Sequence, residues 1–301
     1  MSGLTVALMG VLAALLAGLG WAWWMVRRRP TAVFIWGCRR ALKACGLMPV
    51  TVPSPVGPQH VFVGGSGPVL VLLHGAGDQA GTWARVAPAL VKDHTLVVPD
   101  LAGHGRSAPA SGPIDFSAVV AGLEAVLESQ LRGRRAALVG NSMGGWMATL
   151  LAARHPEWTE RVVPVNGGPL KGLAHTVNLL PRTRAEALKT MTQLRDPDHP
   201  PIPVAVLDDL VRRSRGGALA RLTEAAAGME AWNMDEAQLA ALRAPFRLLW
   251  GTADQLLPMD YARRMAAALP DARLIPIERC GHIPQQEAPG RFLEALAEAL
   301  N

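Results

Sequence analysis

The chain has 301 residues, half of them apolar, with three cysteines and a formal net charge of +6. This length suits one α/β domain of roughly 240–270 residues with additional segments, and the apolar content is enough for a large core. Much of the excess positive charge lies at residues 27–29, and no nucleic-acid-binding motif occurs, so nucleic acid is excluded as a partner. The cysteines are too few and too scattered for a disulfide framework, and the histidines lack partners at metal-ligand spacing. No metal or other cofactor is expected.

The first apolar run, Leu4–Val26, contains no charged residue. As a helix rising ~1.5 Å per residue it would be ~34 Å long, enough to cross a hydrocarbon core of ~30 Å. Tryptophans gather at its end and Arg27–Arg29 follow them, whereas a cleaved signal peptide, the alternative, has its basic residues before the apolar core. We therefore predict a transmembrane anchor over residues 1–30. The positive-inside rule places the arginines, and the domain after them, in the cytoplasm.

Residues 31–58 are predicted to be a juxtamembrane linker. An apolar stretch, Ala32–Trp36, precedes the basic residues Arg39, Arg40 and Lys43. This pattern fits either an amphipathic segment on the membrane surface or a short helix packed against the following domain. The four prolines between residues 49 and 58 then predict an extended tether.

From residue 59 onward, short Val- and Leu-rich runs alternate with helical patterns, which is typical of an α/β fold with a mostly parallel sheet. Val69–Leu73 is a buried strand, and Ser117–Leu131 has the apolar spacing of a helix. The strand leads into His74-Gly75-Ala76-Gly77, where small residues would let the backbone approach a ligand and present N–H groups to it. His74 itself is expected to fix this loop through hydrogen bonds.

The most informative segment is Gly140-Asn141-Ser142-Met143-Gly144, which reads G-x-S-x-G. A predicted strand over residues 135–139 precedes it, and a predicted helix over residues 145–154 follows. A serine on such a sharp strand-to-helix turn is held out of the sheet with its hydroxyl exposed. The turn is tight, so the small residues two places either side of Ser142 are a steric requirement. The sequence therefore predicts Ser142 as a nucleophile.

A serine hydroxyl needs a base, and the base needs an acid to orient it. Asp254 follows a predicted strand over residues 246–250, and His282 follows a last strand over residues 273–277. Catalytic groups collect beyond the carboxyl ends of strands in open α/β sheets. Asp254 could instead cap a helix, and His282 could be an ordinary loop histidine. Their joint placement favours a triad of Ser142, Asp254 and His282.

At this point the chain resembles the α/β-hydrolase superfamily over residues 59–301. Five blocks in the family's order carry the resemblance: His74–Gly77, Pro99–Ser107, Gly140–Gly145, Trp250–Asp254 and Gly281–His282. The resemblance implies that Asp100 and His104, within the second block, brace a turn and are not catalytic. The nucleophile position holds Ser142, whereas the dehalogenase and epoxide-hydrolase branches of the family need an aspartate there. This difference argues against those two chemistries.

The resemblance also implies that the insertion over residues 168–235 is a helical cap over the nucleophile. Helical pieces are predicted over residues 182–194 and 204–213, with prolines between them. The apolar residues of this insertion could line an acyl pocket or form the cap's own core. They are Leu173, Val177, Leu179, Leu180, Met191, Met229, Trp232 and Met234.

The expected reaction is acyl transfer to water through an acyl-enzyme on Ser142. His282 removes the serine proton, Asp254 orients the imidazole, and the backbone N–H groups of Met143 and Ala76 bind the oxyanion, with Gly77 the next choice after Ala76. An active site beside a membrane anchor favours a lipid-like carboxylic ester, and the layout resembles membrane-anchored monoacylglycerol lipases. Carbon–carbon bond hydrolases that act on ring-cleavage dienoates share the Gly-Asn-Ser-Met-Gly-Gly sequence and are the alternative to an ester hydrolase. A non-catalytic membrane-tethered binding protein is a further one.

Overall fold

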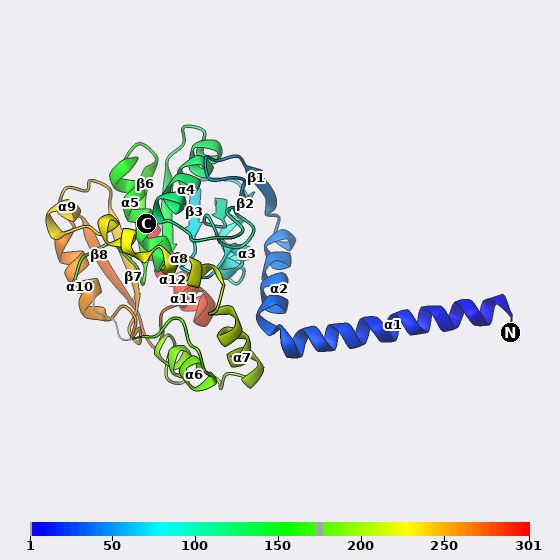
Figure 1. The fold of residues 1–301 in the computed structure, drawn as a ribbon. Helices are drawn as coiled ribbons and strands as arrows, with labels where there is room; N and C mark the ends of the chain where they lie inside the picture. Colours follow the sequence, from blue (N-terminus) through cyan, green and yellow to red (C-terminus); the bar gives the residue numbers. More distant parts are fainter. Residues whose placement is uncertain (1, 173–176) are drawn as a thin grey trace.

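The computed structural model describes residues 2–172 and 177–301. Its centre is an eight-stranded sheet in the order β1-β2-β4-β3-β5-β6-β7-β8 (Figure 1). The strands are β1 (Met48–Val52), β2 (Gln59–Gly64), β3 (Val69–Leu73), β4 (Thr95–Pro99), β5 (Ala136–Asn141), β6 (Thr159–Val165), β7 (Phe246–Gly251) and β8 (Ala272–Ile277). The β1–β2 and β2–β4 pairs are antiparallel, and every pair from β4 to β8 is parallel. The predicted mostly parallel α/β sheet is therefore confirmed.

Helices cover both faces of the sheet, so the central strands are apolar on both sides. Along β3, Val69, Val71 and Leu73 join one apolar cluster, while Leu70 and Leu72 join the other, as the two-residue period of a strand requires. The first cluster includes residues of α4 (Phe116–Leu131), α5 (Met143–Arg154) and α10 (Met259–Ala268). The second includes residues of η1 (Ala80–Trp83), α3 (Ala87–Leu90) and α12 (Pro289–Leu300).

Strand register brings together the loops that carry the predicted site. Leu73 of β3 pairs with Gly140 of β5, so the His-Gly loop begins beside the turn that holds Ser142. Gly251 of β7 pairs with Ile277 of β8, so the loops of Asp254 and His282 leave the sheet as neighbours. All four segments lie at the carboxyl edge of the parallel strands, where open α/β sheets bind ligands.

The N-terminal helix α1 (Gly3–Arg28) projects away from the sheet and its flanking helices (Figure 1). None of its residues is buried, and its mean hydropathy reaches 2.1 over an 18-residue window. The apolar helix predicted over Leu4–Val26 is therefore confirmed. By length and composition it suits either a membrane anchor or a signal sequence.

Residues 31–58 were predicted to contain a surface or packed helix followed by an extended tether, and the structure departs from the tether. Helix α2 (Pro30–Ala44) packs against the domain with Leu42 fully buried, so the packed-helix alternative holds for this part. The extended tether is wrong for residues 48–52, which form β1 and pair along their length with β2. Pro49 is compatible with a strand because β1 lies at the edge of the sheet, where an absent N–H breaks no ladder on the open side.

The insertion between β6 and β7 is helical, as predicted. It contains α6 (Arg184–Gln193), α7 (Val204–Arg213), α8 (Ala218–Glu224), η2 (Ala226–Trp232) and α9 (Glu236–Ala240). Of the residues considered for an acyl pocket, Val177 and Met234 are buried in the first apolar cluster, and Leu179, Met229 and Trp232 pack against it. These side chains therefore contribute to the core. Leu173 lies outside the described residues.

Candidate active site

Ser142 occupies the turn between β5 and α5 with φ 54° and ψ −119°. A positive φ is strained for a residue with a Cβ and persists only where the surroundings enforce it. Here the Ser142 N–H donates to the Val165 carbonyl at 2.9 Å, which fixes the turn to the end of β6. Ser142 is half-buried, whereas its neighbours Asn141 and Met143 are buried. The strained turn therefore leaves the serine accessible.

The glycines around Ser142 meet a steric requirement, as predicted. A Cβ at Gly140 would overlap the carbonyl oxygen of Gly144, and a Cβ at Gly144 would overlap that of Leu73. Gly167, which the sequence analysis did not single out, would collide with the backbone of Ser142 itself. A tight turn therefore needs glycine both within the motif and at the end of the neighbouring strand.

Asp254 and His282 meet through their side chains. His282 Nδ1 donates to Asp254 Oδ2 at 2.8 Å, and the carboxylate is fully buried. The other carboxylate oxygen accepts from the backbone N–H groups of Leu256 at 2.8 Å and Leu257 at 3.1 Å. No helix begins at these residues, because α10 starts at Met259 with Pro258 at its N-cap, so the capping role considered for Asp254 is wrong and its second oxygen instead holds the loop.

Asn166 also holds this pair, and sequence reasoning missed it. It follows β6 with φ 47°, and its Nδ2 donates to Asp254 Oδ2 at 2.6 Å and to the Gly281 carbonyl at 3.1 Å. Its Oδ1 accepts from the Gly251 N–H at 2.9 Å. Asn166 therefore connects the loops of both residues. The available signals were its place after an apolar strand and the tolerance of asparagine for positive φ.

Asn141 connects the nucleophile turn to the histidine loop. Its Nδ2 donates to the His282 carbonyl at 2.9 Å, and its Oδ1 accepts from Gln285 Nε2 at 3.1 Å. Within the described residues no hydrogen bond joins Ser142 Oγ to the His282 ring. Such bonds often form only when substrate is bound, because they are long or poorly aligned in the free enzyme. With Nδ1–H given to the carboxylate, Nε2 is the ring atom left to accept a proton.

The His-Gly loop lies next to the serine. A Cβ on Gly75 would stand 3.1 Å from Ser142 Cβ, so Ala76 follows directly after a point of close approach. His74 is fully buried, its Nδ1 donates to the Gly75 carbonyl at 2.8 Å, and its Nε2 accepts from the Leu101 N–H at 2.9 Å. The prediction that His74 fixes this loop is confirmed. Met143 begins α5, so its N–H is free of the helical ladder.

Asp100 and His104 brace the loop after β4, as the resemblance implied. Asp100 accepts from the backbone N–H groups of Ala80 at 2.8 Å and Arg106 at 2.9 Å, and it forms a buried ion pair with Arg39 of α2 at 2.9 Å. Burial lowers the pKa of His104 to about 3, so its ring is neutral and its Nδ1 donates to the Ala102 carbonyl at 3.0 Å. These contacts are structural.

Within the part of the chain that the structure describes, no group of three His, Cys, Asp or Glu side chains is placed to hold an ion. An oriented imidazole and an accessible hydroxyl at the same edge of the sheet suit proton transfer and nucleophilic attack.

Comparison with known proteins agrees with this geometry. Residues 70–295 match the Alpha/beta hydrolase family, so the chain belongs to that family. It is 31% identical over 239 residues to a pimeloyl-[acyl-carrier protein] methyl ester esterase of Aromatoleum aromaticum, covering 72% of this chain and 92% of the relative. It is 26% identical over 261 residues to a 2-hydroxy-6-oxo-6-phenylhexa-2,4-dienoate hydrolase of Burkholderia cepacia, covering 77% and 87%.

Among solved structures, the chain is similar to a membrane phospholipase A described as a bacterial virulence factor. The TM-score is 0.76 and the identity 25%, and the match covers 99% of both chains. Because 99% of this chain is covered, the likeness extends into the N-terminal helices as well as the sheet. The relatives thus include ester hydrolases and a carbon–carbon bond hydrolase.

Proposed function

We propose that this protein is a membrane-anchored serine hydrolase that cleaves lipid-like carboxylic esters of the monoacylglycerol type through an acyl-enzyme on Ser142. The observation that carries the proposal is the buried 2.8 Å contact between His282 Nδ1 and Asp254, at the same sheet edge as a serine in a strained turn. The carboxylate fixes the tautomer in which Nε2 is the base.

In the first half of the reaction, Ser142 Oγ attacks the ester carbonyl carbon while His282 Nε2 takes its proton. The carbonyl oxygen becomes an oxyanion, which the backbone N–H groups of Ala76 and Met143 bind; removing one such donor typically costs ~3–4 kcal/mol of transition-state stabilisation. The imidazolium then protonates the leaving alcohol. Water repeats the cycle on the acyl-enzyme, and the serine is regenerated.

The lipid-like substrate is proposed from the N-terminal helix. An apolar helix that has no buried residue and ends in Arg27–Arg29 suits a single-pass anchor with the domain in the cytoplasm. It would hold the active site within reach of bilayer esters. The similarity to a membrane phospholipase A along 99% of both chains supports this choice.

Hydrolysis of a carbon–carbon bond in a ring-cleavage dienoate is the second candidate. It is favoured by the dienoate hydrolase among the relatives and by the shared Gly-Asn-Ser-Met-Gly-Gly sequence. The sequence match to that relative covers 77% of this chain, whereas the structural match to the membrane phospholipase covers 99% of it, including the N-terminal helices. We therefore place ester hydrolysis first.

The test uses full-length protein in detergent micelles with p-nitrophenyl esters from acetyl to palmitoyl and with a monoacylglycerol. Ser142→Ala should lower kcat by ~10⁴-fold or more, because the nucleophile is lost. Ser129→Ala, at an exposed serine on α4, is the matched control and should leave the rate unchanged. Ester turnover that survives Ser142→Ala would refute the assignment. Turnover of a dienoate without ester turnover would establish the second candidate.

A further inference from the structure

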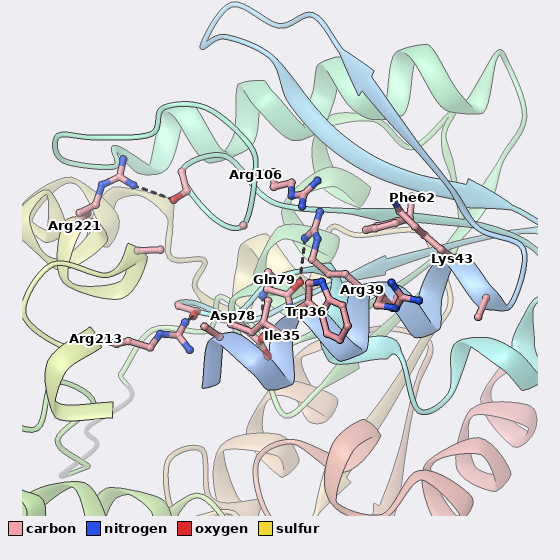
Figure 2. A pocket seen from close by; sticks show the side chains of 17 residues that line it. Ile35, Trp36, Arg39, Lys43, Phe62, Asp78, Gln79, Arg106, Arg213 and Arg221 are labelled. Carbon is pink, nitrogen blue, oxygen red and sulfur yellow. Dashed lines mark hydrogen bonds between the residues drawn. The ribbon is translucent and has the colours of Figure 1, made fainter. Parts of the chain in front are cut away.

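A groove of about 880 Å³ lies between α2, the loops after β3 and β4, and the cap helices α7 and α8 (Figure 2). Its α2 wall includes Trp36, Arg40 and Lys43, which recur at the spacing of one helix face. Arg106 comes from the loop after β4, and the cap contributes Arg213 and Arg221. Neither Ser142 nor His282 lines it, so it is distinct from the proposed catalytic centre.

The groove carries positive charge that the described residues do not neutralise. Among its cations, Arg39 is paired with the buried Asp100. Within residues 2–172 and 177–301, no carboxylate forms an ion pair within 4 Å of the side-chain nitrogens of the remaining basic residues of the lining. They are Arg40, Lys43, Arg106, Arg213 and Arg221. Of the described lining residues Asp78 alone has a carboxylate, and it accepts from Gln286. The lining therefore has an excess of cations.

Several of these cations are held in place by neutral groups. Arg221 donates to the carbonyls of Gly112, Gly103 and Pro109 at 2.7, 3.1 and 2.7 Å, which orients its guanidinium without cancelling its charge. The Arg40 guanidinium stacks over the Trp36 ring at 4.8 Å. A guanidinium fixed in this way binds phosphate oxygens with little further loss of side-chain freedom.

The groove also lies close to the proposed membrane surface. α2 begins two residues after α1 ends, and as a 15-residue helix it is ~22 Å long. Every residue of α2 that lines the groove therefore lies within about this length of the end of the anchor. The side chains of Phe34 and Trp36 on the same helix are 55% and 61% exposed. At the other end, the groove reaches Gly77 and Asp78, directly after Ala76 of the proposed oxyanion loop.

We propose that this groove binds the phosphate of an anionic phospholipid headgroup presented by the bilayer. Phosphate oxygens match the clustered guanidinium and ammonium donors, and anionic lipid is the natural partner of basic residues beside a membrane helix. The inference has two parts. If an anionic phospholipid bound in the groove is also the substrate, it extends from the groove toward Ser142, and this part rests on the proposed function. As a statement about binding, the inference stands alone.

Binding is therefore measured separately from catalysis, on full-length Ser142→Ala protein in neutral detergent micelles by isothermal titration calorimetry. The probes are dihexanoyl phosphatidylglycerol, dihexanoyl phosphatidylcholine and inorganic phosphate. Phosphatidylglycerol should bind at least ~10-fold more tightly than phosphatidylcholine, because the choline cation would lie among arginines. Inorganic phosphate binding as tightly as phosphatidylglycerol would overturn the assignment to a lipid headgroup.

The groove variant combines Arg40→Gln, Lys43→Gln and Arg106→Gln, all at exposed positions. It should abolish the preference for phosphatidylglycerol. The matched control is Arg28→Gln, an exposed arginine at the end of α1 outside the groove, which should retain the preference. Lys43→Glu alone provides a second test if the triple variant does not fold, and it should weaken phosphatidylglycerol binding several-fold. Unchanged affinity in the groove variants, or an equal loss in Arg28→Gln, would overturn the proposal.

The esterase assay on wild-type protein is independent of this titration. A groove that binds phosphatidylglycerol in a protein that cleaves no ester would leave the site standing and refute the function. Ester turnover without the binding preference would do the reverse. The two results are therefore distinguishable.

Discussion

Replacement of Asp254 by asparagine changes one atom of a fully buried side chain at a point where its chemistry matters. The carboxylate accepts from His282 on Oδ2 and from the N–H groups of Leu256 and Leu257 on Oδ1. An amide has one accepting oxygen. If that oxygen keeps the two backbone bonds, its NH₂ group faces His282 Nδ1, which must then become an acceptor.

That reversal sets the expected magnitude. His282 would carry its proton on Nε2, the atom that has to receive the proton of Ser142, so the base is lost although the fold remains. We expect kcat to fall ~10⁴-fold, which corresponds to ~5.5 kcal/mol of transition-state stabilisation, with KM little changed. The free energy of unfolding should fall by only ~1–3 kcal/mol. This cost arises because the new NH₂ group of the asparagine faces the Nδ2 donor of Asn166, where the Asp254 oxygen had accepted a hydrogen bond.

The assay is steady-state hydrolysis of a p-nitrophenyl ester by full-length protein, with thermal unfolding measured in parallel. Asp260→Asn is the matched control, since the Asp260 side chain on α10 is 87% exposed and pairs only with Arg263 within the described residues. It should be indistinguishable from wild type. If Asp254→Asn kept more than a tenth of the wild-type kcat, the role assigned to the Asp254–His282 contact would be refuted.

Three further substitutions test other parts of the structure. Asn166→Asp replaces a donor 2.6 Å from Asp254 with a second carboxylate, so the pair should share a proton and ester turnover at pH 7 should fall at least ~100-fold; wild-type turnover would contradict this. His104 has a folded pKa of about 3 against an ordinary 6.5, so the unfolded chain binds more protons between these values. This group should therefore lower the free energy of unfolding by ~1.4 kcal/mol for each pH unit as the pH falls from ~6.5 toward ~3. In urea unfolding, the free energy of unfolding of His104→Asn should depend less steeply on pH than that of the wild type. Gly144→Ala should lower the thermal midpoint by several degrees because its Cβ overlaps a β3 carbonyl, whereas Gly290→Ala, with open space around the new Cβ, should not; equal midpoints would refute the steric argument.

Local patterns were enough to predict four of the eight strands, β3, β5, β7 and β8. Residues 69–73 are β3 as expected, and the strands expected over 246–250 and 273–277 are β7 and β8 within a residue or so. The run of β3 is apolar and buried on both faces because helices cover both sides, which gives a strong signal in a single sequence. The G-x-S-x-G turn was equally readable as a local pattern, although only the clash at Gly140 is with near neighbours, whereas the clash at Gly144 is with Leu73 of β3.

The linker and Asn166 were not readable in the same way. The alternation of apolar and basic residues in α2 fits a membrane surface as well as a protein surface, and Arg39 is buried only because Asp100, 61 positions away, receives it. Prolines favour an extended chain, but whether that chain pairs depends on an available sheet edge, which β2 supplies to β1. The role of Asn166 depends on loops that follow it by more than eighty residues.

The sequence by itself determined the apolar N-terminal helix, the strands β3, β5, β7 and β8, and the identity of Ser142, Asp254 and His282 as candidates, because apolar runs and turn residues are patterns of near neighbours in the chain. Tertiary structure alone decided that Asp254 contacts His282, that Asn166 and Asn141 hold their loops, and that α2 and the cap enclose a basic groove. Those contacts join segments tens to hundreds of residues apart, and their formation depends on the register of the parallel strands.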